Sequence, residues 1–139
     1  PSLQLDPEGM RRVIRNLLDN AVAACRTEGN GNAGKVEVIT RYLQPLGIVR
    51  LEVVDNGCGV PANIKERLFE PYVSTKKDGT GLGLAIVATV VAEHQAFIRV
   101  RDNIPRGSRF VIEIPVRRGD FQARIIGDSA GPSLGDKQS

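Results

Sequence analysis

Apolar side chains near the start of the chain recur at the spacing of an amphipathic helix. They lie three or four residues apart and would share one helix face: Met10, Val13, Ile14, Leu17, Leu18, Ala21 and Val22. Asp6 is a suitable N-cap just before this stretch, and Pro7 suits the first helical position. The pattern predicts a helix from Pro7 to about Cys25, followed by a loop rich in Gly and Asn over residues 27–32.

Alternation of apolar and polar residues predicts strands further along the chain. Residues 36–42 and 48–54 alternate in this way. The short Pro/Gly turn between them predicts an antiparallel hairpin. Residues 96–101 and 110–116 alternate as well, on either side of a second turn with Pro and Gly. A short edge strand is also expected at Leu3-Gln4-Leu5.

Two more helices are predicted in the middle of the chain, a short one over residues 62–69 and a long apolar one over about residues 81–94. Residues 70–80 between them have no clear period and are predicted to form a loop. Helices and strands in this order favour an α/β two-layer sandwich, and the hairpin-short connections argue against an all-parallel sheet. Residues 119–139 are poor in apolar side chains, so we expect a disordered tail after a folded unit of residues 1–118.

The overall composition argues against several classes of function. The chain has 139 residues, of which 41% are hydrophobic and 25% charged, and its net charge is +3. These values are typical of one globular domain. So small a positive charge, with no Trp, two Tyr and four Phe, argues against nucleic-acid binding. Cys25 and Cys58 have no metal-ligand spacing, and a single His excludes a multi-His metal centre.

No stretch of the sequence is apolar over the length that a membrane span needs. The longest one, from Leu82 to Ala92, is interrupted by Thr89 and is too short. We therefore expect a cytoplasmic domain without direct membrane contact. Any membrane anchor of the full-length protein would lie in another part of it.

A glycine-rich segment, Gly79-Thr80-Gly81-Leu82-Gly83-Leu84, opens the long apolar helix. Glycines let a ligand approach the backbone closely, and the start of a helix offers free N–H groups to phosphate. The spacing matches neither the dinucleotide-binding fingerprint nor the P-loop. The alternative is a glycine-rich turn without a ligand.

Polar residues at two other places could bind a ligand. Asp55 ends an apolar strand next to Gly57 and Gly59, where its carboxylate could accept a hydrogen bond from a ligand amine or only stabilise its own turn. Asn16 and Asn20 lie four residues apart on one face of the first helix. Their amide oxygens could bind a hard cation such as Mg²⁺, or the two side chains could cap neighbouring loops.

Four short segments occur in order along the chain: Arg15-Asn16-Leu17-Leu18-Asp19-Asn20-Ala21, Asp55-Asn56-Gly57-Cys58-Gly59-Val60, Leu68-Phe69-Glu70-Pro71-Tyr72 and Gly79-Thr80-Gly81-Leu82-Gly83-Leu84. Together they resemble the N, G1, F and G2 boxes of the ATP-binding domain of sensor histidine kinases, within the gyrase/Hsp90/histidine kinase/MutL superfamily. The resemblance covers the chain from about Leu5 to Val116. Residues 69–76 are most similar to the nitrogen-regulation kinases of the NtrB/NtrY type.

The resemblance implies a Bergerat-type fold, with a mixed sheet of about five strands packed on three helices. ATP and Mg²⁺ would be held between helices and a lid. By the same resemblance, Asn20 binds the Mg²⁺, Asp55 binds the adenine amino group, and Gly57 and Gly59 let the base in. Ser108 matches a position that supports adenine through water.

Further residues are assigned to the ATP site by the same boxes. Gly79, Gly81, Leu82 and Gly83 match the hinge of the lid and the start of the phosphate-facing helix. The other positions carried over are Asn16, Val60, Phe69, Lys76, Thr80 and Leu84.

The chain departs from the family pattern at three places. Asn16 stands where the superfamily's ATPases carry a water-activating glutamate. An amide cannot act as a general base, so ATP hydrolysis should be weak. Ala23 replaces a common Lys or Arg, which leaves the phosphate charge to another cation: Lys76, Lys77 or Arg15. The usual His-Gly-Gly after the long helix is His94-Gln95-Ala96.

His94 is the only histidine of the chain. It lacks the acidic neighbour of a phosphoacceptor and ends a predicted helix, where the helix dipole favours a His side chain. We expect it to have a structural role.

These features predict the catalytic ATP-binding domain of a two-component sensor histidine kinase. It would transfer the γ-phosphoryl group of ATP to a histidine on a separate dimerisation and phosphoacceptor domain that this chain lacks, so it would not phosphorylate itself alone. The full-length kinase would then act on a response regulator.

Two alternatives to this function are compatible with the sequence. One is a serine kinase or ATPase of the same superfamily, against which Phe69 and Thr75-Lys76 argue. The other is a degenerate nucleotide-binding scaffold, against which Asn20, Asp55 and the glycine boxes argue.

Overall fold

The computed structural model describes residues 3–26, 33–73 and 81–116. In chain order these residues form α1 (Pro7–Arg26), β1 (Val36–Leu43), the short 3-10 helix η1 (Gln44–Leu46), β2 (Ile48–Asp55), α2 (Ala62–Lys65), α3 (Gly83–Glu93), β3 (Phe97–Asp102) and β4 (Ser108–Pro115). The predicted tail and most of the predicted loop over residues 70–80 lie outside the described residues. None of the described helices combines the length and the apolar character that crossing a membrane requires.

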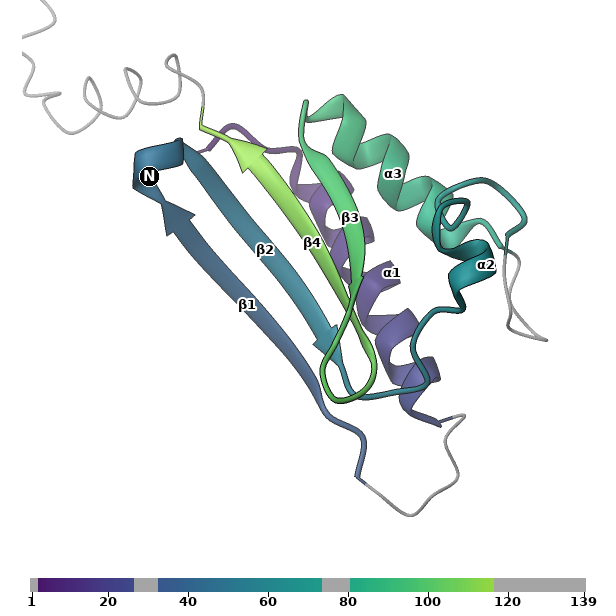
Figure 1. Ribbon diagram of the computed structural model, residues 1–139. Helices are drawn as coiled ribbons and strands as arrows, with labels where there is room; N and C mark the ends of the chain where they lie inside the picture. The colour runs from purple at the N-terminus through teal and green to yellow at the C-terminus, as the bar shows by residue number, and fades with distance from the viewer. Residues whose placement is uncertain (1–2, 27–32, 74–80, 117–139) are drawn as a thin grey trace, which may run out of the picture.

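The four strands form one sheet in the order β1-β2-β4-β3, and every neighbouring pair is antiparallel. α1 and α3 lie on one side of this sheet (Figure 1), which confirms the predicted α/β two-layer sandwich. The sheet differs from the mixed sheet of about five strands that the resemblance implied, because the described residues contribute four strands without a parallel pair.

The edge strand predicted at Leu3-Gln4-Leu5 was wrong. Leu3 and Leu5 line a groove together with Thr40 and Tyr42 of β1, but residues 3–5 are not part of the sheet. A segment of three residues can make few ladder hydrogen bonds, so proximity to β1 does not make it a strand.

α1 begins and ends close to its predicted limits, whereas the later helices are shorter than predicted. Asp6 caps α1, since its Oδ1 accepts a hydrogen bond from the Glu8 backbone N–H at 3.2 Å. α2 ends at Lys65 and not near residue 69. α3 begins at Gly83 because Gly81 has a φ of +74°, a left-handed conformation that an α-helix cannot include.

The core lies between the sheet and the two long helices. Its fully buried apolar side chains come from all of these elements: Val13 and Leu17 of α1, Val53 of β2, Val87 of α3 and Ile112 of β4. Burying each such side chain contributes roughly 1.5–3 kcal/mol to folding. α1 and α3 approach closely at Gly9, where an added Cβ would lie 3.0 Å from the Val90 Cγ1 atom.

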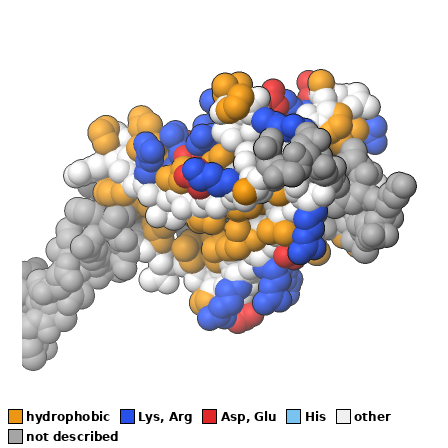
Figure 2. Space-filling model, turned by 90° about the horizontal axis from the view of Figure 1, so that it is seen from below, with side chains coloured by type: hydrophobic (Ala, Val, Ile, Leu, Met, Phe, Trp, Pro, Cys, Tyr) orange, Lys and Arg blue, Asp and Glu red, His pale blue; other side chains and the backbone are white. Residues whose placement is uncertain are grey.

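The apolar layer reaches the surface beside the edge strand β1. Val38 pairs with buried Val53, and Tyr42 with Val49, so both side chains are on the helix-covered side of the sheet. Even so, Val38 is 50% exposed and Tyr42 is 41% exposed. Seen from below, hydrophobic side chains form a band across the middle of the molecule, with Lys and Arg on both sides of it (Figure 2). The helices therefore cover the centre of the sheet more fully than its β1 edge.

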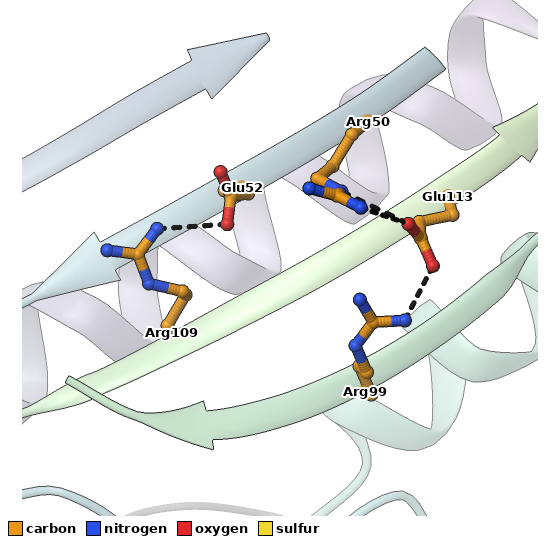
Figure 3. Close-up of polar contacts among 5 residues, drawn as sticks. All are labelled: Arg50, Glu52, Arg99, Arg109 and Glu113. Carbon is orange, nitrogen blue, oxygen red and sulfur yellow. Dashed lines mark hydrogen bonds and ion pairs between the residues drawn. The ribbon is translucent and has the colours of Figure 1, made fainter. Parts of the chain in front are cut away.

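The opposite face of the sheet carries a network of cross-strand ion pairs (Figure 3). Glu113 accepts hydrogen bonds from Arg50 Nη2 at 2.8 Å and from Arg99 Nη1 at 2.5 Å. Arg109 Nη1 donates to Glu52 Oε1 at 2.9 Å. The hydrogen bonds from Arg50 and then Arg99 lower the pKa of Glu113 below its usual value, so the ionised carboxylate stabilises the folded state.

Replacing Glu113 by Gln is expected to lower the free energy of unfolding at pH 7 by about 1–2 kcal/mol, because two arginines lose a charged acceptor. The pKa of Glu113 is lower in the folded chain than in the unfolded one. Its contribution is therefore complete above the unfolded pKa of about 4.3 and is lost as the pH falls through the folded pKa. Urea unfolding of both chains at several pH values measures this. An undiminished difference in acid would contradict the assignment.

Candidate functional site

Asp55, the last residue of β2, has a carboxylate that three donors hold in place. Its Oδ1 accepts from the backbone N–H groups of Gly57 at 2.9 Å and Ser108 at 3.3 Å, and its Oδ2 accepts from the Ser108 hydroxyl at 2.7 Å. Asp55 is only 2% exposed. The bond to Gly57 stabilises the local turn, but the bonds to Ser108 come from another strand. They fix the direction of the remaining acceptor positions of the carboxylate.

The turn between β3 and β4 lies against the residues that follow β2. Asn103 Nδ2 donates to the carbonyl oxygen of Asp55 at 3.0 Å, and Arg106 Nε donates to that of Gly57 at 3.2 Å. Gly107 has a φ of +106°, and a Cβ added to it would lie 1.9 Å from the Asp55 carbonyl oxygen. This close approach requires glycine.

One face of α1 connects the two glycine segments. Near its middle, Asn16 lies against α3, since a Cβ added to Gly83 would be 3.0 Å from Asn16 Oδ1. At its end, Ala24 lies against the turn after β2, since a Cβ added to Gly57 would be 2.6 Å from the Ala24 carbonyl oxygen. Asn20 is four residues from each and shares their face. The rise along α1 from Asn16 to Ala24 is about 12 Å.

The residues just before α3 lie against the end of the segment that follows α2. The Tyr72 backbone N–H donates to the Gly81 carbonyl oxygen at 2.8 Å, and a Cβ added to Gly81 would lie 2.5 Å from the Tyr72 Cα. The start of α3 itself lies next to α1, through the contact of Gly83 with Asn16. The first N–H groups of an α-helix have no acceptor within the helix and favour an anion.

The other predicted site residues surround these elements or lie outside the described part of the chain. Val60 and Leu84 are half-buried against the core. Phe69 packs edge-on against Phe110, with ring centroids 6.3 Å apart. Gly59 has a φ of +76°, and Leu82 is the N-cap residue of α3. The residues outside the described ranges are Lys76, Lys77, Gly79 and Thr80.

Sequence reasoning missed three residues that shape the site. Ala24 has no chemistry of its own and contributes through its carbonyl oxygen. The sequence pattern places Asn103 and Arg106 only in a hairpin turn. Their one visible signal is their position just before Ser108, which the resemblance had already assigned to the site.

Comparison with known protein families assigns the chain to one of them. Residues 5–118 match the family described as Histidine kinase-, DNA gyrase B-, and HSP90-like ATPase. The chain belongs to this family. The site described above lies within the matching residues, and the predicted resemblance is confirmed.

Two relatives are sensor kinases. The chain is 36% identical over 116 residues to the sensor histidine kinase ZraS of Escherichia coli strain K12, and the match covers 84% of this chain and 23% of ZraS. It is 36% identical over 117 residues to the sensory histidine kinase/phosphatase NtrB of Rhodobacter capsulatus, with 80% and 33% covered. The NtrB match agrees with the predicted similarity to nitrogen-regulation kinases. The chain spans about a quarter to a third of these curated relatives.

Solved structures of histidine kinases share the fold. The mycobacterial sensor histidine kinase MprB superposes with a TM-score of 0.69 at 32% identity, covering 79% of this chain and 74% of MprB. Full-length ShkA, solved in complex with AMPPNP, superposes with a TM-score of 0.65 at 34% identity, covering 77% of this chain and 21% of ShkA. The chain is thus an ATP-binding catalytic domain of the sensor histidine kinase type.

Proposed function

We propose that the chain binds ATP together with Mg²⁺ along α1 and donates the γ-phosphoryl group to a histidine of a separate dimerisation and phosphoacceptor domain of the same kinase. The observation that carries this proposal is the arrangement of α1. It presents Asn16 to the start of α3 and Ala24 to the turn after Asp55. An amine-acceptor site and an anion site are thereby held on one rigid element.

Asp55 is the adenine acceptor in this proposal. An ionised carboxylate accepts hydrogen bonds only, so it matches the amino group of adenine and repels a carbonyl oxygen at the same place. Gly57 and Gly59 bring the backbone close to the base without side chains in the way. Ser108 holds the carboxylate through its hydroxyl.

Asn20 and the start of α3 form the phosphate end. Among residues 3–26, 33–73 and 81–116, no group of three or more His, Cys, Asp and Glu could hold a metal ion. The Asn20 amide oxygen with phosphate oxygens is a donor set that fits Mg²⁺, which prefers oxygen ligands and binds largely through substrate phosphates. When bound, the ion neutralises charge on the β- and γ-phosphates. Lys76, Lys77 or Arg15 supplies the remaining positive charge.

The residues of this chain position the reactants and do no covalent chemistry themselves. A nitrogen of the acceptor histidine forms a bond to the γ-phosphorus while the bond from that phosphorus to the β–γ bridging oxygen breaks, and ADP leaves. Positioning and charge neutralisation are the main catalytic contributions in phosphoryl transfer. By the resemblance, Asn16 stands at the position of the water-activating glutamate, and an amide cannot accept that proton, so hydrolysis stays slow.

His94 is not the acceptor in this proposal. Its Nε2 accepts a hydrogen bond from the Asp6 backbone N–H at 2.9 Å, and its Nδ1 lies 2.8 Å from the Val90 carbonyl oxygen. Both ring nitrogens are therefore engaged at the end of α3, where the ring joins α3 to the start of α1. In the full-length kinase, the acceptor histidine passes its phosphoryl group to a response regulator. We place this domain of the kinase in the cytoplasm.

Radiolabelled ATP distinguishes this function from its alternatives. The chain alone is expected to bind ATP, to incorporate no label itself, and to hydrolyse ATP only slowly. Adding the dimerisation segment of the same kinase should produce acid-labile label on that segment. Asn20→Ala should lower the initial rate of this phosphorylation about tenfold or more, because the Mg²⁺ bound to the phosphates would lose a protein ligand.

The matched control is Asn63→Ala, which alters an exposed asparagine of α2 and should leave the rate unchanged. Acid-labile label on His94 of the chain alone would contradict the proposal. Rapid phosphate release by the chain alone would favour an ATPase.

A further inference from the structure

The turn between β3 and β4 holds the adenine end of the site through two side chains that the family boxes do not include. Asn103 Nδ2 donates to the Asp55 carbonyl oxygen at 3.0 Å and to the Arg106 carbonyl oxygen at 3.1 Å. Arg106 Nε donates to the Gly57 carbonyl oxygen at 3.2 Å. The two donors come from one turn and reach two residues on either side of Asn56.

The contact from Asn103 lies where the β2–β4 pairing ends. The last paired residues are Val54 of β2 and Arg109 of β4, so Asp55 is one residue beyond that pairing. Its carbonyl oxygen then faces the turn, where Gly107 leaves room and Asn103 donates. The Asn103 side chain therefore continues the attachment of β2 beyond the point where the backbone ladder stops.

The same turn also sets the position of the Asp55 carboxylate. Ser108 follows Gly107 directly and supplies two of the three donors to that carboxylate. The third donor is the Gly57 N–H, and the carbonyl of Gly57 is the one that Arg106 holds. Both residues that donate to the carboxylate, Ser108 and Gly57, are therefore attached to the turn of residues 103–107. Ser108 follows the turn in the chain, and Gly57 accepts a hydrogen bond from it.

We propose that Asn103 and Arg106 are positioning residues for adenine recognition, acting through Asp55. The inference rests on the proposed function, in which Asp55 accepts from the adenine amino group. Discrimination against guanine depends on where the carboxylate points, because guanine carries an oxygen at the corresponding position and would be repelled. Loosening the turn should weaken ADP binding and discrimination together.

The test uses the 139-residue chain and its affinities for ADP and GDP measured by calorimetry. Asn103→Ala and Arg106→Ala should each weaken ADP binding about two- to tenfold, with little change for GDP, so that the ADP:GDP preference falls. Arg106→Lys keeps a donor and should recover part of the loss. Arg101→Ala, on an exposed residue of β3 in the same hairpin, is the matched control and should leave both affinities unchanged.

Thermal unfolding of the unliganded variants separates positioning from stability. If the turn matters only for folding, the variants lose melting temperature while the ADP:GDP preference of the folded chain stays unchanged, and this result would overturn the inference. Unchanged ADP affinity in folded Asn103→Ala and Arg106→Ala would overturn it as well. A wild-type chain without measurable ADP binding would instead contradict the proposed function itself.

Discussion

Asp55→Asn is expected to weaken ADP and ATP binding by about ten- to a hundredfold while the chain remains folded. The substitution keeps the size of the side chain but removes its charge and turns one acceptor into a donor that faces the base. Loss of a charge-assisted hydrogen bond in a buried site costs about 1.5–3 kcal/mol. Calorimetry with ADP measures the loss directly.

Asp55→Ala tests the same assignment with a larger structural cost. The Ser108 hydroxyl and the Gly57 N–H donate to this carboxylate, and alanine leaves both without it. We therefore expect Asp55→Ala to lower the melting temperature as well as the affinity, whereas Asp55→Asn mainly lowers the affinity. Normal ADP affinity in a folded Asp55→Asn chain would exclude Asp55 as the adenine acceptor.

Gly107→Ala is expected to destabilise the chain by about 3 kcal/mol or more. The new methyl group would lie 1.9 Å from the Asp55 carbonyl oxygen, a distance that two non-bonded atoms cannot adopt, so the turn must move away from β2. The φ of +106° adds strain for any residue with a Cβ. Urea unfolding measures the free energy, and the displaced turn should also weaken ADP binding.

Gly47→Ala is the matched control for this substitution. Gly47 also has a positive φ, +61°, but an added Cβ meets no atom within 4 Å. Gly47→Ala should therefore lower the free energy of unfolding by only about 1–2 kcal/mol, because alanine disfavours the left-handed conformation. Equal losses of unfolding free energy in the two variants would show that the contact between Gly107 and Asp55 leaves room for a methyl group.

The elements with strong periodicity could be predicted from the sequence. Helical spacing predicted α1, and Val13, Leu17 and Ala21 of that pattern are buried in the structure. Alternation predicted the four strands. The start of α3 was displaced by two residues because the left-handed conformation of Gly81 depends on its contact with Tyr72. That contact joins residues nine positions apart and leaves no periodic pattern.

The site was predictable to the extent that its residues fall in sequence boxes. Asp55 and the glycines around it lie in one box, and in the structure they form the turn at the end of β2. The contacts of Asn103 and Gly107 with Asp55 could not be predicted, because they join residues about fifty positions apart through the pairing of β2 with β4. Hairpin turns of this composition are common, and only the sheet order brings this one to Asp55.

The rigid span of α1 between Asn16 and Ala24 bears on the choice of small-molecule inhibitors. At the proposed adenine end, a compound would meet β2, the β3–β4 turn and the end of α1, which backbone and side-chain hydrogen bonds already hold together. A fragment that pairs with Asp55 needs neither a metal ion nor contact with α3. Little of its binding energy would be lost to ordering the protein. If Asp55 accepts from adenine as proposed, this end of the site is therefore the better starting point for fragment-based inhibitors of this domain.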